Sequence, residues 1–237
     1  MSRLEPVMCK RLPSGDILRV YPEEQPESPR KWDNLGKLYG WHRSIASPDP
    51  LPFHGADVSY VLRDYIPEEH WDDITEDRMS FDEAVQIVNA TGEALCLFVY
   101  AYVHSGVVLS NNESRSGQFR DPWDSGVFGI QFVAKADIIK NLGDVHGLGR
   151  PTEDDWKKHA RHVLDGELQT FNTWLSGNVH GYIITDAVTG EQRDSCWGFY
   201  GDPDQAGFDG HFDTGGVPVS ELPDAEACHC CGRVYAA

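Results

Sequence analysis

Apolar residues form two continuous runs whose length and composition suit strands. Residues 94–103 (ALCLFVYAYV) and 126–134 (GVFGIQFVA) are rich in β-branched and aromatic types, so we expect both to be strands buried on both faces. Alternating patterns and turn residues predict the remaining strands. These are residues 17–21 and 107–109, and a hairpin made by 179–186 and 192–199 around Thr189-Gly190.

Helical spacing appears in three other segments. Ser80 and Glu83 form a capping-box pattern before an apolar stripe, which predicts a helix from Phe81 to about Thr91. A second stripe runs from Trp156 to Leu175 after several acidic residues, and Gly177 is placed to end that helix. Residues 137–142 predict a short helix.

The order of these elements indicates the fold class. Strands and helices are segregated rather than regularly alternating, so we predict an α+β fold with a mostly antiparallel sheet packed against a few helices. The length of 237 residues fits a single compact domain. We place the main domain at residues 1–201 and a Gly/Asp-rich and Cys-rich tail at 202–237.

The net charge of the chain limits the kinds of partner that we expect the protein to bind. The chain has 20 Lys and Arg against 38 Asp and Glu, a net charge of −18. The acids concentrate in residues 46–89 and 163–237. Direct nucleic-acid binding and binding to an anionic membrane are therefore not expected, because both need clustered basic residues. The two acidic blocks suit a basic partner, and the alternative is a solvated surface that serves solubility.

The N-terminal segment and the cysteines bear on location. The first residues have no apolar core of the kind found in a secretory signal, and the longest apolar run is too short to span a membrane. The six cysteines do not form a spaced disulfide framework. We expect a cytoplasmic protein with reduced thiols.

Four polar–aromatic clusters carry the candidate chemistry, because each places Trp or Tyr beside Asp, Ser or His, close to a glycine. Cluster one spans residues 27–43, cluster two 102–106, cluster three 122–126 and cluster four 194–201. The strings ESPRKWDNLG, PWDSG and DSCWGFYG in these clusters resemble an uncharacterised family of bacteriophage and mobile-element proteins. The resemblance covers roughly residues 20–201 and implies an accessory protein that acts inside a bacterial host cell.

Two functions follow as hypotheses. The first is a binding protein that inhibits a host or defence protein through an acidic surface. The alternative is a small hydrolase, or a sequestering protein, for a nucleotide-like ligand. For the alternative, the catalytic set is His104, Asp124 and His42. The predicted ligand-binding residues are Trp32, Asp33, Asn34, Arg43, Tyr102, Ser105, Trp123, Ser125, Asp194, Trp197 and Tyr200.

Each candidate also has a structural interpretation. His104 can hydrogen-bond within its turn, and Asp121 and Asp124 can cap a turn instead of holding a metal or a cationic ligand. Cys228 and Cys231 have the spacing of a zinc knuckle, which would need further ligands such as His211 or Cys9. The common cavity that the alternative requires depends on folding the four clusters together.

Overall fold

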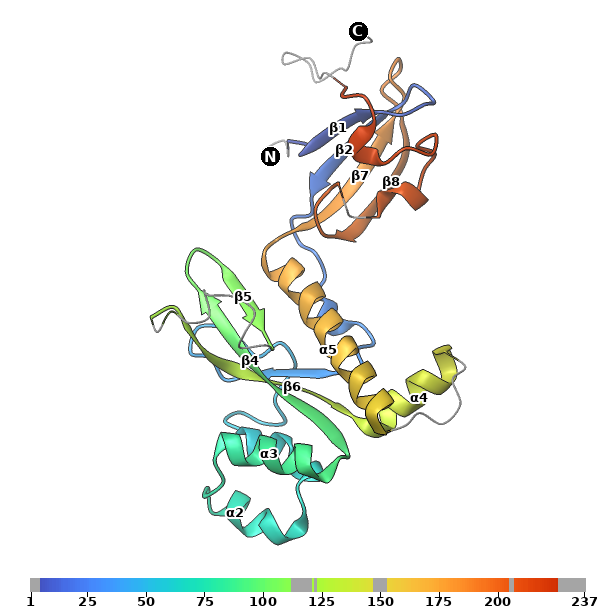
Figure 1. The fold of residues 1–237 in the computed structure, drawn as a ribbon. Helices are drawn as coiled ribbons and strands as arrows, with labels where there is room; N and C mark the ends of the chain where they lie inside the picture. Colours follow the sequence, from blue (N-terminus) through green and yellow to red (C-terminus); the bar gives the residue numbers. More distant parts are fainter. Residues whose placement is uncertain (1–4, 112–120, 122, 147–152, 205–206, 226–237) are drawn as a thin grey trace. The chain divides into compact units, whose positions relative to one another are not determined.

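The computed structural model describes residues 5–111, 121, 123–146, 153–204 and 207–225. The chain divides into two compact units (Figure 1). Unit 1 comprises Met1–Ser28 and Thr173–Ala237, and unit 2 comprises Pro29–Asn172. The predicted α+β class with antiparallel strands is confirmed, because each unit is built on an antiparallel sheet.

Unit 2 is organised around a four-stranded sheet in the order β3-β6-β4-β5. Its strands are β3 (Lys37–Gly40), β4 (Ala94–Val103), β5 (Val107–Ser110) and β6 (Ser125–Ala134). Its α-helices are α1 (Val58–Val61), α2 (Trp71–Thr75), α3 (Phe81–Thr91), α4 (Lys135–His146) and α5 (Glu153–Leu175), the last of which ends in unit 1. Short 3-10 turns are η1 (Pro29–Lys31), η2 (Arg63–Tyr65) and η3 (Glu68–His70).

The central strand β4 separates two apolar layers, as its continuous hydrophobicity predicts. Successive side chains of a strand point to opposite faces. Ala94 and Cys96 therefore pack with the core formed by α1, α2 and α3, while Leu95 and Leu97 pack with α4 and α5. The structure thus confirms the strand predicted at 94–103 and gives it a helical layer on each face.

Helix α3 begins and ends where the sequence predicts. Ser80 Oγ accepts a hydrogen bond from the Glu83 backbone N–H, and the Ser80 backbone N–H donates one to the Glu83 carboxylate, which completes the capping box. Gly92 ends the helix at φ 72°, a conformation that costs glycine little.

Two asparagine side chains occupy open backbone positions of this sheet. The Asn89 amide both donates to and accepts from the Cys96 backbone, each at 2.9 Å. The Asn172 amide does the same at Leu109, with both distances 2.8 Å. Each amide therefore takes the place of a neighbouring strand at one residue, which covers polar groups that a sheet edge would otherwise expose.

Unit 1 contains the second four-stranded sheet, in the order β1-β2-β7-β8. Its strands are β1 (Met8–Arg11), β2 (Ile17–Pro22), β7 (Val179–Thr185) and β8 (Gln192–Tyr200), followed by the 3-10 turns η5 (Phe208–Gly210) and η6 (Val219–Glu221). The predicted hairpin is confirmed as β7 and β8. Phe208, Val219 and Leu222 pack onto the same core as Tyr182 and Phe199, so the chain after β8 covers one face of the sheet.

Candidate functional site

Clusters two and three lie together at one end of the sheet in unit 2. Tyr102 on β4 is paired with Ser125 on β6, and the Val103 N–H donates to the Asp124 carbonyl at 2.8 Å. Tyr102 also pairs with Val108 on β5. The antiparallel register therefore places part of the predicted ligand-binding set side by side.

The turn of cluster three is built by Asp121. Its carboxylate accepts the Trp123 N–H at 2.9 Å, and its carbonyl accepts the Ser125 N–H at 3.0 Å and the Ser125 hydroxyl. This is an Asx-type turn, which agrees with the structural interpretation of Asp121. The Trp123 ring projects from the turn and is 90% exposed.

His104 lies beside Tyr102 in the turn after β4. The two rings are parallel to within 6°, with centroids 6.3 Å apart, and Ser105 next to them is exposed. Among the described residues the His104 imidazole has no hydrogen-bond or ion-pair partner, Asp124 included. Proton transfer by a histidine requires an oriented imidazole, so the catalytic roles of His104 and Asp124 remain predictions.

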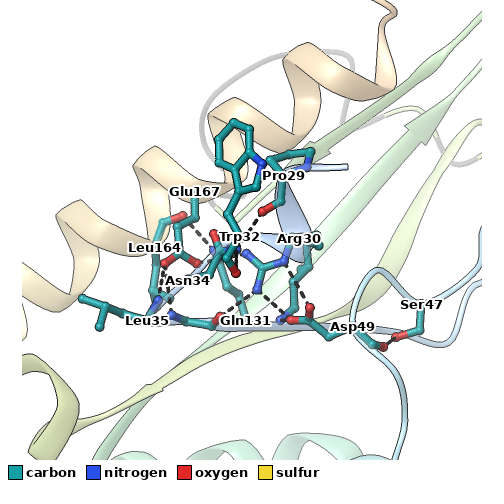
Figure 2. A network of polar contacts seen from close by, with 12 residues as sticks. Pro29, Arg30, Trp32, Asn34, Leu35, Ser47, Asp49, Gln131, Leu164 and Glu167 are labelled. Carbon is teal, nitrogen blue, oxygen red and sulfur yellow. Dashed lines mark hydrogen bonds and ion pairs between the residues drawn. The ribbon is translucent and has the colours of Figure 1, made fainter. Parts of the chain in front are cut away.

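The middle of cluster one surrounds a buried arginine rather than an open cavity (Figure 2). Arg30 donates to Asp49 at 2.7 Å, to Glu167 at 3.0 Å and to the Gly36 carbonyl at 2.6 Å. The side chains of Arg30, Asp49 and Glu167 are only 3%, 8% and 13% exposed. We call these three side chains, with the backbone of Leu35, Gly36 and Leu38, the Arg30 network.

The two carboxylates of the network also hold backbone groups. Asp49 accepts the Leu38 N–H at 2.6 Å, and Glu167 accepts the N–H groups of Leu35 and Gly36 at 2.9 and 3.1 Å. Burial by itself lowers the pKa of Arg30, but hydrogen bonds and charge from Asp49 and Glu167 outweigh it, so the net pKa is raised. The carboxylates are thus occupied by protein groups, and the network joins η1, β3 and α5.

The predicted ligand-binding residues of cluster one border this network. The Asn34 amide donates to the carbonyls of Pro29 and Trp32, so Asn34 closes the turn that carries Arg30. Trp32 and Asp33 are exposed. Further along the chain, His42 Nδ1 accepts the Ser44 N–H at 3.2 Å, and Arg43 is exposed.

Cluster four belongs to unit 1 and is described by itself. Asp194 accepts the Tyr182 hydroxyl at 2.9 Å, and burial together with this carboxylate raises the pKa of Tyr182. The Trp197 ring covers Gly181 so closely that a Cβ there would lie 2.1 Å from it. Tyr200 donates its hydroxyl to the Glu27 carbonyl. Each of these contacts helps to hold the sheet of unit 1.

Most acidic residues of the block 46–89 lie on α1, α2, α3, η2 and η3. We call residues 57–91, which contain these elements, the acidic lobe. Its apolar residues pack onto the sheet through Leu62, Ile74 and Val88. Most of its acidic side chains are exposed to solvent. These are Asp64, Glu68, Glu69, Asp72, Glu76, Asp77, Asp82 and Glu83.

Few cations offset these acids. Arg78 pairs with Asp73 at 2.8 Å and with Glu76, while the Arg63 guanidinium lies 4.7 Å above the Trp71 ring. Five other exposed carboxylates of the acidic lobe form no ion pair with any Lys, Arg or His in the described part of the chain. They are Asp64, Glu68, Asp72, Asp77 and Asp82.

The predicted zinc ligands Cys228 and Cys231 lie outside the described residues. Within the described ranges, no group of three or more His, Cys, Asp or Glu side chains is arranged to hold a metal ion. Cys96 is buried, which raises the pKa of its thiol, and Cys9 and Cys196 are partly buried free thiols. In the same ranges no helix is both long and apolar enough to cross a membrane.

Comparisons with protein-family models, with curated proteins and with solved structures found no match.

Proposed function

We propose that the protein is a binding protein and that its acidic lobe captures a basic partner. The observation that carries this proposal is a set of exposed carboxylates that form no ion pair with any residue the structure describes, namely Asp64, Glu68, Asp72, Asp77 and Asp82. Exposed charges of one sign attract an oppositely charged surface and speed its association, and salt weakens the attraction. The apolar contacts of the lobe with the sheet present these charges on a packed scaffold.

The partner class follows from the same charges. A surface rich in carboxylates repels the phosphates of nucleic acids and of anionic lipids, so the partner is a protein with a basic surface. Together with the resemblance to bacteriophage and mobile-element proteins, this favours an accessory protein that acts in the bacterial cytoplasm. Its target would be a host or defence protein whose basic surface it occupies.

Capture from bacterial cytoplasmic extract tests this function. The lobe variant carries Asp64→Asn, Glu68→Gln, Asp72→Asn and Asp77→Asn. A matched control removes the same number of exposed charges from unit 1, with Glu5→Gln, Glu24→Gln, Asp204→Asn and Glu221→Gln. We expect wild type and control to retain a basic protein that the lobe variant loses and that salt releases. A partner held equally by all three proteins would refute the proposal. A protein that wild type and control retain and the lobe variant loses is then purified, and its affinity for each of the three is measured directly.

A second candidate has one observation in its favour, the pairing that places Tyr102 beside Ser125 and the exposed Trp123 near the same sheet end. This arrangement suits sequestration of a planar, nucleotide-like ligand by stacking. His104→Ala, with binding and turnover of a nucleoside triphosphate measured separately, distinguishes sequestration from hydrolysis. Wild-type protein that neither binds nor hydrolyses the nucleotide would eliminate this candidate.

A further inference from the structure

An exposed pair of aromatic rings lies where the acidic lobe begins. Phe53 and Tyr60 are 51% and 37% exposed, and their rings meet edge to face at 5.4 Å and 80°. Large apolar side chains that remain exposed on a folded surface are frequent contact points for partners, and aromatic residues are enriched among the residues that dominate binding.

The backbone that carries Phe53 is fixed. The Ala56 N–H donates to the Phe53 carbonyl at 3.1 Å, and Gly55 between them has φ 87°, so the segment forms a tight turn that requires glycine. Ala56 is fully buried, and its carbonyl accepts the Trp41 indole N–H at 2.7 Å. The Phe53 ring is therefore held at the surface by an ordered turn.

Tyr60 is held by the start of helix α1. Its backbone N–H donates to the Asp57 carboxylate at 3.0 Å, which caps the helix, and the Ser59 hydroxyl donates to the same oxygen at 2.7 Å. Since both rings are attached to ordered backbone, little conformational entropy would be lost when a partner contacts them.

Two arginines of the acidic lobe make contacts that an arginine of a partner could also make. The Arg63 guanidinium stacks on Trp71, and Arg78 bridges Asp73 and Glu76. A guanidinium both stacks on aromatic rings and pairs with carboxylates, whereas the more strongly hydrated lysine ammonium stacks less readily. The exposed aromatic pair offers the first of these contacts to an incoming side chain, and the exposed carboxylates of the acidic lobe offer the second to the same partner.

We propose that Phe53 and Tyr60 form the docking point for an arginine side chain of the basic partner. This inference rests on the proposed function, because the carboxylates of the acidic lobe supply the charge that brings the partner in. It adds a selectivity that charge alone does not provide, namely arginine over lysine.

Two peptide probes test the inference on the full chain. One is an acetylated, amidated octapeptide that alternates arginine with glycine, and the other replaces each arginine by lysine. Affinities are measured by calorimetry or NMR titration at about 50 mM salt, where surface charges are only partly screened. The variants are Phe53→Ser/Tyr60→Ser and Phe53→Leu/Tyr60→Leu, the second of which keeps apolar side chains without aromatic rings. Val188→Ser is the control, because it removes an apolar side chain that is 94% exposed and lies in unit 1.

We expect wild type and Val188→Ser to bind the arginine peptide about two- to fivefold more tightly than the lysine peptide. Both double variants should bind the two peptides equally, with unchanged unfolding free energies. Equal binding by wild type, or a preference that survives in the double variants, overturns the inference and leaves the acidic-lobe function standing. If wild type binds neither peptide, the proposed function fails as well.

Discussion

The Arg30 network and the acidic lobe use the same residue types in the same unit, with opposite results. In the network, two buried carboxylates share one arginine and also accept backbone N–H groups. In the lobe, Arg78 is about half exposed and most of the surrounding carboxylates lack an ion pair in the described structure. A buried charge must be compensated within the fold, whereas an exposed charge can remain available for a partner.

Removing the arginine of the network should have the largest effect. Arg30→Met leaves Asp49 and Glu167 buried without their cation, so we expect unfolding free energy to fall by about 3–5 kcal/mol. Arg78→Ala should cost about 1 kcal/mol or less, because that arginine is exposed. Urea unfolding of both variants measures the contrast, and equal losses would contradict it.

Neutralising one carboxylate of the network should have an intermediate effect. Glu167→Gln keeps an oxygen that can accept the N–H groups of Leu35 and Gly36 but weakens the bond from Arg30. We expect a loss of about 1–3 kcal/mol by the same urea measurement, and a larger loss for Glu167→Ala. If the alanine variant is no worse than the glutamine variant, the backbone contacts of Glu167 contribute nothing.

Neutralising the acidic lobe should barely change stability. The four substitutions of the lobe variant remove repulsion between exposed like charges. The unfolding free energy should therefore rise slightly, by about 1 kcal/mol or less relative to wild type. Urea unfolding at low and at high salt checks this, because the difference should shrink as salt screens the repulsion. A large loss would show that these carboxylates hold the fold together.

The smallest effect concerns the cap of α3. Hydrogen bonds from the Ser80 hydroxyl and backbone lower the pKa of Glu83. A lowered pKa means that the ionised carboxylate stabilises the fold above its ordinary pKa, and that this contribution is lost as pH falls through the lowered value. In Ser80→Ala we expect the pKa of Glu83 to move back towards its ordinary value in an NMR titration. An unchanged titration would mean that Ser80 does not cause the shift.

The long periodic segments and the short strands β2 and β5 could be predicted from sequence, whereas β1, β3, α1 and α2 could not. The hydrophobic runs and caps predicted β4, β6, α3, α5 and the β7–β8 hairpin, because these elements carry their own pattern over many residues. Strand β3 has four residues, and its pairing with Ile130 and Gly129 of β6 depends on chain that is distant in sequence. Helices α1 and α2 are also too short to show a period.

The candidate sites show the same limit. The string ESPRKWDNLG stood out in the sequence and contains Arg30. Its pattern did not show that Arg30 would be buried, because the partner Glu167 lies far along the chain. Nothing local in residues 46–57 indicated that Asp49 would be buried beside it. The acidity of residues 57–83 was visible from composition, whereas its packing into one lobe required the fold.

The most direct test of the central claim measures partner capture and unfolding free energy on the same lobe variant. If the exposed carboxylates serve binding and not folding, the variant keeps the unfolding free energy of wild type and loses the basic partner that the unit 1 control retains. Capture that is undiminished in a stably folded lobe variant would contradict the claim.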